Sequence, residues 1–269
     1  MRITRFAAGD EVSYGLVGTA RAGSGAAGGE VIAELAGHPF GGRDGIRLTG
    51  TTYLVDEVRL LAPVLPSKVI GFAPSGPDPA RPADDGLADG SVMYLKPATA
   101  VCGPLDPIRY PALTQRLEAS GELAVVIARL CRQVPAEQAA AVILGYACAL
   151  DVTAGDLAER DGQWARAKGF DTFCPLGPWL ETGAGGDVEV VTSVNGQVRQ
   201  RATVPAPGRD MAALVAAASN VMTLLPGDVL LGGAAGAAGT GGVMLNCGDE
   251  VSVSIDGIGT LTNRVEKGD

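Results

Sequence analysis

The chain has 269 residues, 46% of them hydrophobic, which is enough for one medium domain or two small ones around a substantial core. Its 30 acidic and 21 basic residues give a net charge of −9, which repels a polyanion and argues against nucleic acid as a partner. The apolar stretches are shorter than a membrane-spanning helix and the N-terminus lacks an apolar signal region, so we expect a cytoplasmic protein with no membrane partner.

The first part of the chain, residues 1–64, is predicted to form short strands separated by glycine-rich turns. The patterns of MRITRFAAG, SYGLVG, GEVIAELAG and YLVDEVRLLAPV support this interpretation. The proline-marked joint APVLPSK then separates this small β-rich N-terminal domain from a second unit, residues 65–269, which opens with the buried strand KVIGF. We therefore expect two domains.

A long segment from Ala73 to Ser91, APSGPDPARPADDGLADGS, is rich in proline, glycine and aspartate and has almost no apolar anchor. Loops of this length are usually lids or disordered segments. We expect a lid that is poorly ordered until a ligand binds.

Strands dominate the second unit. They are predicted in SVMYLKPATAVCGP, GELAVVIARL and YACALDVT, the last ending at Asp151, and in the closing segments DVLLGG and DEVSVSIDGIGTLTNRV. VPAEQAAAVILGYA is predicted as a helix that starts at a proline, and DMAALVAAASNVMTLLPGD as a longer helix stopped by Pro226 and Gly227. The expected fold class is therefore α+β, mostly β.

Cysteine and histidine narrow the possible chemistry. The five cysteines are scattered and include no CxxC pair, so neither a disulfide framework nor a zinc site is indicated, and most should be small core residues. The single histidine, His38, stands in LAGHPFGG, which is typical of a solvated turn. A catalytic relay through histidine is therefore not expected.

Two carboxylates are predicted at strand ends, Glu122 in GELAVVIARL and Asp151 in YACALDVT. A carboxylate that enters an apolar strand must be paired, protonated or bound to a metal. Two such acids could hold a hard cation such as Mg²⁺, which leaves coordination positions for a substrate. The spacing alone leaves open the alternative that both acids cap turns in solvent.

Longer motifs add a family resemblance that covers nearly the whole chain. RLLAPVLPSKVIGF, YLKPATAVCGP, GELAVVIARL, DGQWARAKGFDTFCPLGPWLET, VNGQVRQ, LLPGDVLLGG and GDEVSVSIDGIGTLTNRV occur in the order and spacing that resemble the fumarylacetoacetate hydrolase family. The resemblance implies a mixed β-sandwich roll, usually a homodimer, with a small N-terminal domain. It also implies an Mg²⁺ or Mn²⁺ site that chelates a small-molecule 2-oxo acid or β-diketo acid.

The metal site that the resemblance implies is incomplete in this chain. The family uses a Glu-x-Glu pair and an aspartate, to which Glu122 and Asp151 correspond, but Ser120 stands at the place of the first glutamate. Because a serine hydroxyl is a poor replacement for a carboxylate, we expect the metal to be weakly bound or absent. The implied metal ligands are Glu122 and Asp151 alone.

Other residues that the family uses are also replaced. The lid has no histidine, Gly155 and Ala158 stand where an arginine and a glutamine contact substrate, and Ala234 beside Gly233 stands where a threonine binds the substrate carboxylate. Gly155, Gly233 and Ala234 would then line an altered substrate site. Lys168 matches the family lysine that stabilises enolate or oxyanion charge, although it could instead be the partner that neutralises Glu122 or Asp151.

Two interpretations of function follow. In the first, the chain is a divergent enzyme of specialised metabolism that acts on a 2-oxo acid or β-dicarbonyl compound by a lyase, isomerase, dehydratase or cyclase step, with Lys168, Glu122 and Asp151 as acid and base groups. In the second, it is an inactive homologue that binds a ligand or serves as a structural subunit. Ordinary acylpyruvate hydrolysis or decarboxylation is a weaker third alternative, because general-base activation of water needs a base within hydrogen-bond reach.

Overall fold

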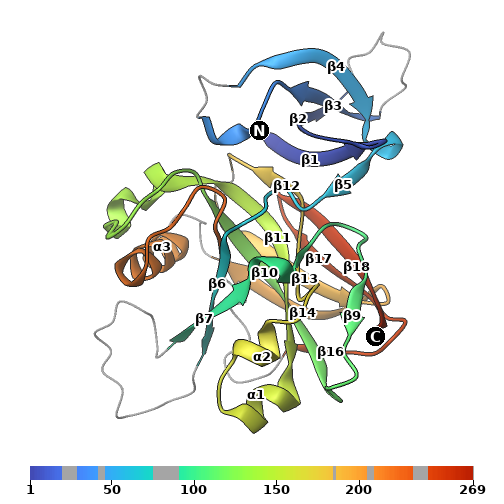
Figure 1. Ribbon diagram of the computed structural model, residues 1–269, viewed down its shortest axis with the longest axis vertical. Helices are drawn as coiled ribbons and strands as arrows, with labels where there is room; N and C mark the ends of the chain where they lie inside the picture. The colour runs from blue at the N-terminus through green and yellow to red at the C-terminus, as the bar shows by residue number, and fades with distance from the viewer. Residues whose placement is uncertain are drawn as a thin grey trace.

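Strands form most of the protein in the computed structural model, and two mixed sheets contain them (Figure 1). The structure describes residues 1–19, 29–41, 46–74, 91–183, 186–204, 209–232 and 242–268. The predicted fold, mostly β with a β-rich N-terminal part, is confirmed.

The N-terminal strands form an antiparallel layer, at the top of Figure 1, in the order in which the chain supplies them. They are β1 (Arg2–Ala8), β2 (Glu11–Thr19), β3 (Glu30–Leu35) and β4 (Leu48–Leu54), while β5 (Arg59–Leu61) pairs with β1 on its other side. β1 also pairs with β12, so this layer continues into the main sheet. The division into domains at residue 64 stays a prediction.

The main sheet continues from β1 in the order β12, β11, β10, β15, β6 and β7. Its strands are β6 (Lys68–Pro74), β7 (Ser91–Pro97), β8 (Val101–Cys102), β10 (Leu117–Ile127), β11 (Ile143–Ala154), β12 (Cys174–Glu181), β15 (Val229–Gly232) and β16 (Val243–Leu245). The second sheet has the order β14 (Gln197–Val204), β13 (Val188–Val194), β17 (Glu250–Ile255), β18 (Gly259–Lys267) and β9 (Ile108–Tyr110).

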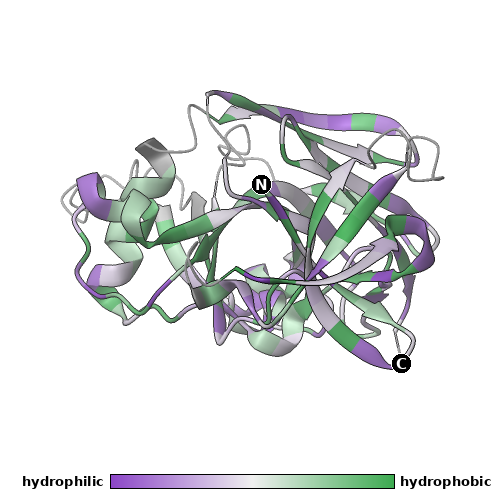
Figure 2. Ribbon diagram, turned by 90° about the horizontal axis from the view of Figure 1, so that it is seen from above, coloured by the Kyte–Doolittle hydropathy of each residue, from purple (hydrophilic) through white to green (hydrophobic). Residues whose placement is uncertain are grey.

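Helical segments are few in the described ranges. They are α1 (Gly155–Asp161), α2 (Ala165–Lys168) and α3 (Arg209–Val221), with short 3-10 turns η1 (Pro39–Gly41), η3 (Val55–Glu57), η5 (Ala98–Ala100) and η6 (Ala136–Val142). α3, the longest, consists mainly of hydrophobic residues, as Figure 2 shows. Its residues Met211, Val215 and Ala218 are buried in the core. No helix in the described part of the chain is long and apolar enough to cross a membrane.

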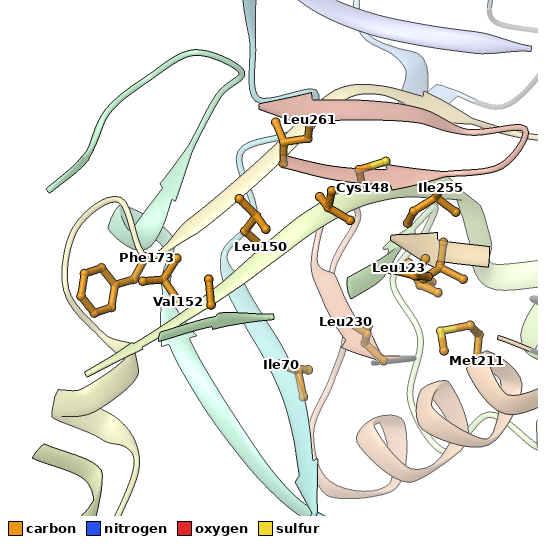
Figure 3. Packing of buried hydrophobic residues seen from close by; sticks show 14 of the residues in the cluster. Ile70, Leu123, Cys148, Leu150, Val152, Phe173, Met211, Leu230, Ile255 and Leu261 are labelled. Carbon is orange, nitrogen blue, oxygen red and sulfur yellow. The ribbon is translucent and has the colours of Figure 1, made fainter. Parts of the chain in front are cut away.

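The two sheets pack against each other through β10 and β11. Leu123, Cys148 and Leu150 point from these strands toward Ile255 and Leu261 of the second sheet, as Figure 3 shows. Since alternate residues of a strand lie on opposite faces, the residues between them, such as Glu122 and Asp151, lie on the other face of the main sheet. The sheet-on-sheet core therefore fixes which face carries the candidate site.

The segment VPAEQAAAVILGYA was predicted as a helix, and this prediction is wrong for its second half. Only Ala136–Val142 is helical, as a 3-10 segment, and β11 begins at Ile143, which pairs with Ile127 of β10. The high helix propensity of alanine amounts to fractions of a kcal/mol per residue, so pairing of the β-branched and aromatic residues that follow outweighs it. β11 is consequently longer than predicted and runs to Ala154.

Candidate functional site

The strand register brings five polar residues onto one face of β10 and β11, which we call the polar face. Glu118 lies opposite Thr153, Ser120 opposite Asp151, and Glu122 opposite Ala149. Glu122 and Asp151 were predicted at strand ends, and this is wrong: both lie within their strands. Glu122 and Asp151 are buried, at 7% and 5% exposure, so neither acid caps a turn in solvent.

Asp151 is surrounded by three donors from other parts of the chain. Its Oδ2 atom lies 2.5 Å from Nζ of Lys168 and accepts a hydrogen bond from the Tyr94 hydroxyl at 2.6 Å, while Oδ1 lies 2.8 Å from Nζ of Lys96. Burial alone would raise the pKa of this carboxyl, but the ammonium groups of Lys168 and Lys96 outweigh burial and hold the pKa well below its usual range. Asp151 is therefore an anion at neutral pH.

Lys96 was not singled out in the sequence, yet it is among the largest fully buried side chains. Besides its ion pair with Asp151, its ammonium donates hydrogen bonds to the carbonyl oxygens of Val152 (2.8 Å), Phe173 (2.8 Å) and Lys168 (3.2 Å). Burial lowers the pKa of Lys96, while Asp151 opposes that shift. Lys96 thus joins β7 to three segments that build the site.

Tyr94 was also missed, and its place depends on a glycine across the β6–β7 pair. Gly71 is paired with Tyr94, and a Cβ atom at Gly71 would lie 2.1 Å from the tyrosine ring. Burial, followed by the charges of Asp151 and Glu122, raises the pKa of Tyr94 well above its usual value. The phenol therefore stays protonated and acts as a donor to Asp151.

Lys168 lies at the end of α2 and is 4% exposed. Its ammonium donates to Thr153 Oγ1 at 2.8 Å in addition to Asp151, and it lies 4.3 Å from the ring centre of Tyr94 and 5.1 Å from that of Trp164. Two aromatic faces and two oxygens thus fix the charged group in one place. Of the two carboxylates predicted as its partner, Lys168 pairs with Asp151.

Glu122 lies one row along the polar face from Asp151. The Ser120 hydroxyl donates a hydrogen bond to its Oε1 atom at 2.9 Å. Ser120, which stands at the position of the first family glutamate, is therefore a hydrogen-bond donor to Glu122. The site thus brings together two carboxyl side chains, Glu122 and Asp151, and two lysines, Lys96 and Lys168.

Other predicted residues fall outside this cluster. Gly155 begins α1 and is buried, and Ala158 on the same helix packs against the hydrophobic core. Gly233, Ala234 and residues 75–90 of the predicted lid lie outside the described residues. His38 is exposed in a turn, where its Nδ1 accepts a hydrogen bond from the Phe40 amide at 3.2 Å, as predicted.

Cys174 lies close to the charged cluster but is not a nucleophile. Burial raises the pKa of its thiol to about 12, so the reactive thiolate is not formed at neutral pH. Four of the five cysteines are buried and Cys247 is exposed, which confirms that most of them are core residues.

The polar face does not fit a hard dication well. Among the described residues, no group of three or more histidine, cysteine, aspartate or glutamate side chains is placed to hold a metal ion. Both oxygens of Asp151 already face ammonium groups, and Glu122 is the other acid of the implied pair. Mg²⁺ needs several oxygen ligands in a regular octahedron, so we derive no chemical step through a metal.

Replacing Ser120 with glutamate is expected to create measurable Mg²⁺ and Mn²⁺ binding, which should be weak or absent in the natural chain. Because Ser120 lies opposite Asp151, the new carboxylate would complete a set of three on the polar face. Calorimetric titration measures this, with Ser120→Gln as the uncharged control. Micromolar binding by the natural chain would contradict the prediction.

Residues 73–266 match the model of the fumarylacetoacetate hydrolase C-terminal domain, and residues 1–63 match the model described as Rv2993c-like, N-terminal. The chain belongs to the fumarylacetoacetate hydrolase family. Members of this family commonly bind Mg²⁺ or Mn²⁺.

Individual relatives agree with this assignment. The protein Rv2993c of Mycobacterium tuberculosis is 45% identical over 236 residues, which is 86% of each chain. The crystal structure of 5-carboxymethyl-2-hydroxymuconate delta-isomerase from Mycobacterium smegmatis, also 45% identical, superposes with a TM-score of 0.84 over 99% of this chain and 100% of that one. A mitochondrial oxaloacetate tautomerase of Bos taurus is 34% identical over 219 residues, 78% of this chain and 70% of the relative.

Proposed function

We propose that this protein is an enzyme that isomerises a small 2-oxo acid by moving a proton to and from the carbon next to the ketone. The observation that carries the proposal is the Lys168 ammonium, which is 4% exposed and fixed by Asp151, Thr153 and two aromatic rings. A buried, oriented cation stabilises the negative oxygen of an enolate much more strongly than a solvated one. Relatives with isomerase and tautomerase names support this class of reaction.

Glu122 is the proposed base in this reaction. Glu122 lies one row from Asp151 on the same face. The ion pairs of Asp151 with Lys168 and Lys96 favour its ionised form, so Asp151 is a poor proton acceptor. Glu122 would remove the proton from carbon and return it at the same or another position. The Ser120 hydroxyl donates to Oε1 and orients the carboxylate for this transfer.

Hydrolysis lacks a comparable arrangement. The single histidine of the chain, His38, is exposed in a turn after β3 and makes its hydrogen bond with Phe40. An isomerase needs no activated water, so Glu122 on the polar face and Lys168 beside it supply the proton acceptor and the positive charge that the reaction requires.

Exchange of carbon-bound hydrogen for deuterium tests the proposal directly. We expect the protein to accelerate exchange at the carbon next to the ketone of oxaloacetate and of 2-oxoheptanedioate in deuterated buffer, followed by nuclear magnetic resonance. Glu122→Gln should slow exchange by about 10²–10⁴-fold, the usual contribution of a general base. Glu137→Gln, on the exposed surface of η6, is the matched control.

Two other results would contradict the proposed function and favour a different one. Absence of exchange with every 2-oxo acid tried would favour an inactive homologue. Rapid cleavage of an acylpyruvate, with release of pyruvate, would favour ordinary hydrolysis.

A further inference from the structure

Strand β10 is paired on one side only at the point where it carries the proposed base. β16 pairs with residues 117–119 of β10, and β15 pairs with residues 123–126. Among the described residues, no strand continues this pairing along the segment between them, Ser120–Glu122. β11 pairs with the same segment on its other side. The backbone that carries Glu122 therefore needs another contact to fix it from the side that β15 and β16 leave open.

Thr192 of the second sheet supplies this contact. It lies on β13 and is 1% exposed, and its Oγ1 atom accepts a hydrogen bond from the backbone amide of Gly121 at 3.1 Å. The bond is buried, and a buried amide that has no acceptor is costly. The threonine hydroxyl thus takes the place of a strand carbonyl at Gly121.

Gly121 permits this close approach because it has no side chain. A Cβ atom at Gly121 would lie 2.4 Å from Oγ1 of Thr192 and 2.7 Å from Cγ2 of Val253, and both residues belong to the second sheet. Gly121 is not among the glycines with positive φ, so the space taken by these neighbours accounts for the glycine. The two sheets are therefore in direct contact at the residue between Ser120 and Glu122.

The position of Gly121 sets the position of both residues beside it. Consecutive Cα atoms are joined by a planar peptide of fixed length, so a shift of Gly121 moves its two neighbours as well. These neighbours are Glu122 and Ser120, whose hydroxyl donates to Oε1 of Glu122. Asp151 and Lys168, by contrast, lie on β11 and α2 and bind each other directly. Loss of the Thr192 contact should thus displace the base and spare the cation.

We propose that Thr192 is a positioning residue for the isomerisation. Its hydroxyl fixes the backbone of Ser120–Glu122, so that the Glu122 carboxylate lies at the reacting carbon. Proton transfer needs the acceptor within hydrogen-bond reach, and a displacement of about 1 Å can lower the rate about 10²-fold. The inference rests on the proposed function and adds that the second sheet takes part in setting the geometry of the site.

Thr192→Val tests this role, because valine keeps the shape of the side chain and removes the acceptor. We expect kcat for hydrogen exchange in oxaloacetate to fall by about 10–10²-fold, with KM nearly unchanged because Lys168 is retained. Thr192→Ser keeps the hydroxyl and should restore kcat. The amide of Gly121 should exchange with solvent faster in Thr192→Val than in the natural protein. Rates are compared at a temperature at which circular dichroism shows every variant to be folded.

Ser219→Ala is the matched control. Ser219 is also fully buried, and its Oγ atom accepts a hydrogen bond from a backbone amide, that of Val134, at 2.9 Å. It lies on α3, which packs on β15 and η6. The variant therefore removes the same kind of hydrogen bond at a distance from the polar face. It should be less stable than the natural protein but retain the natural kcat when folded.

A double-mutant cycle separates positioning from stabilisation. If Thr192 acts through Glu122, Thr192→Val should cause no further loss of kcat in a Glu122→Gln background. An equal loss in both backgrounds, or an unchanged kcat in Thr192→Val, would overturn the role of Thr192 and leave the proposed function in place. A natural protein that exchanges hydrogen in no 2-oxo acid would contradict the proposed function and this inference together.

Discussion

Replacing Lys96 with methionine should lower the free energy of unfolding by about 3–5 kcal/mol, the usual loss when one partner of a buried ion pair is removed. The variant would leave Asp151 with one ammonium partner instead of two and would remove donors from the carbonyl oxygens of Val152 and Phe173. Urea denaturation followed by circular dichroism measures the change.

An exposed ion pair supplies the control for Lys96. Arg201 lies 2.8 Å from Glu189 on the second sheet, and both side chains are exposed, so Arg201→Met should cost less than about 1 kcal/mol. Equal losses in the two variants would show that Lys96 contributes no more than a surface charge.

Replacing Lys168 with methionine should reduce the rate of hydrogen exchange in 2-oxo acids by about 10²–10³-fold, because it removes the oriented cation that stabilises the enolate. Methionine retains much of the side-chain volume between Tyr94 and Trp164, and Asp151 keeps its contacts with Lys96 and Tyr94. The variant should therefore remain folded.

Arg166 on the same short helix is the matched control for Lys168. Its ion pair with Asp161 is solvent-exposed, so Arg166→Met should retain near-natural exchange rates. Unchanged exchange in Lys168→Met would remove Lys168 from the reaction and with it the proposed mechanism.

The sequence predicted the strands well and the long-range contacts poorly. Alternating patterns located β10, β11 and the closing strands β17 and β18, because the period of two reflects one buried face. The strand patterns singled out Glu122 and Asp151, and the resemblance to a family added Lys168. The helix predicted at VPAEQAAAVILGYA was largely wrong because strand pairing outweighed local propensity.

Lys96 and Tyr94 could not be found in the same way. Both contact Asp151, which is more than fifty residues away in the sequence. The segment SVMYLKP alone does not indicate which residue these side chains contact. One signal was available: in the predicted strand SVMYLKP, the lysine lies two residues after the tyrosine and so on the same face, and a lysine on a buried face needs a partner.

The contact between Gly71 and Tyr94 has a consequence for how this protein can change by mutation. Because the tyrosine ring fills the volume of a side chain at position 71, the effects of substitutions at the two positions should be strongly non-additive. A larger residue at position 71 becomes tolerable only after position 94 has become smaller, and that step removes the phenol from Asp151. The order in which mutations are accepted is thus restricted, and a lineage that lost the glycine would lose the tyrosine first.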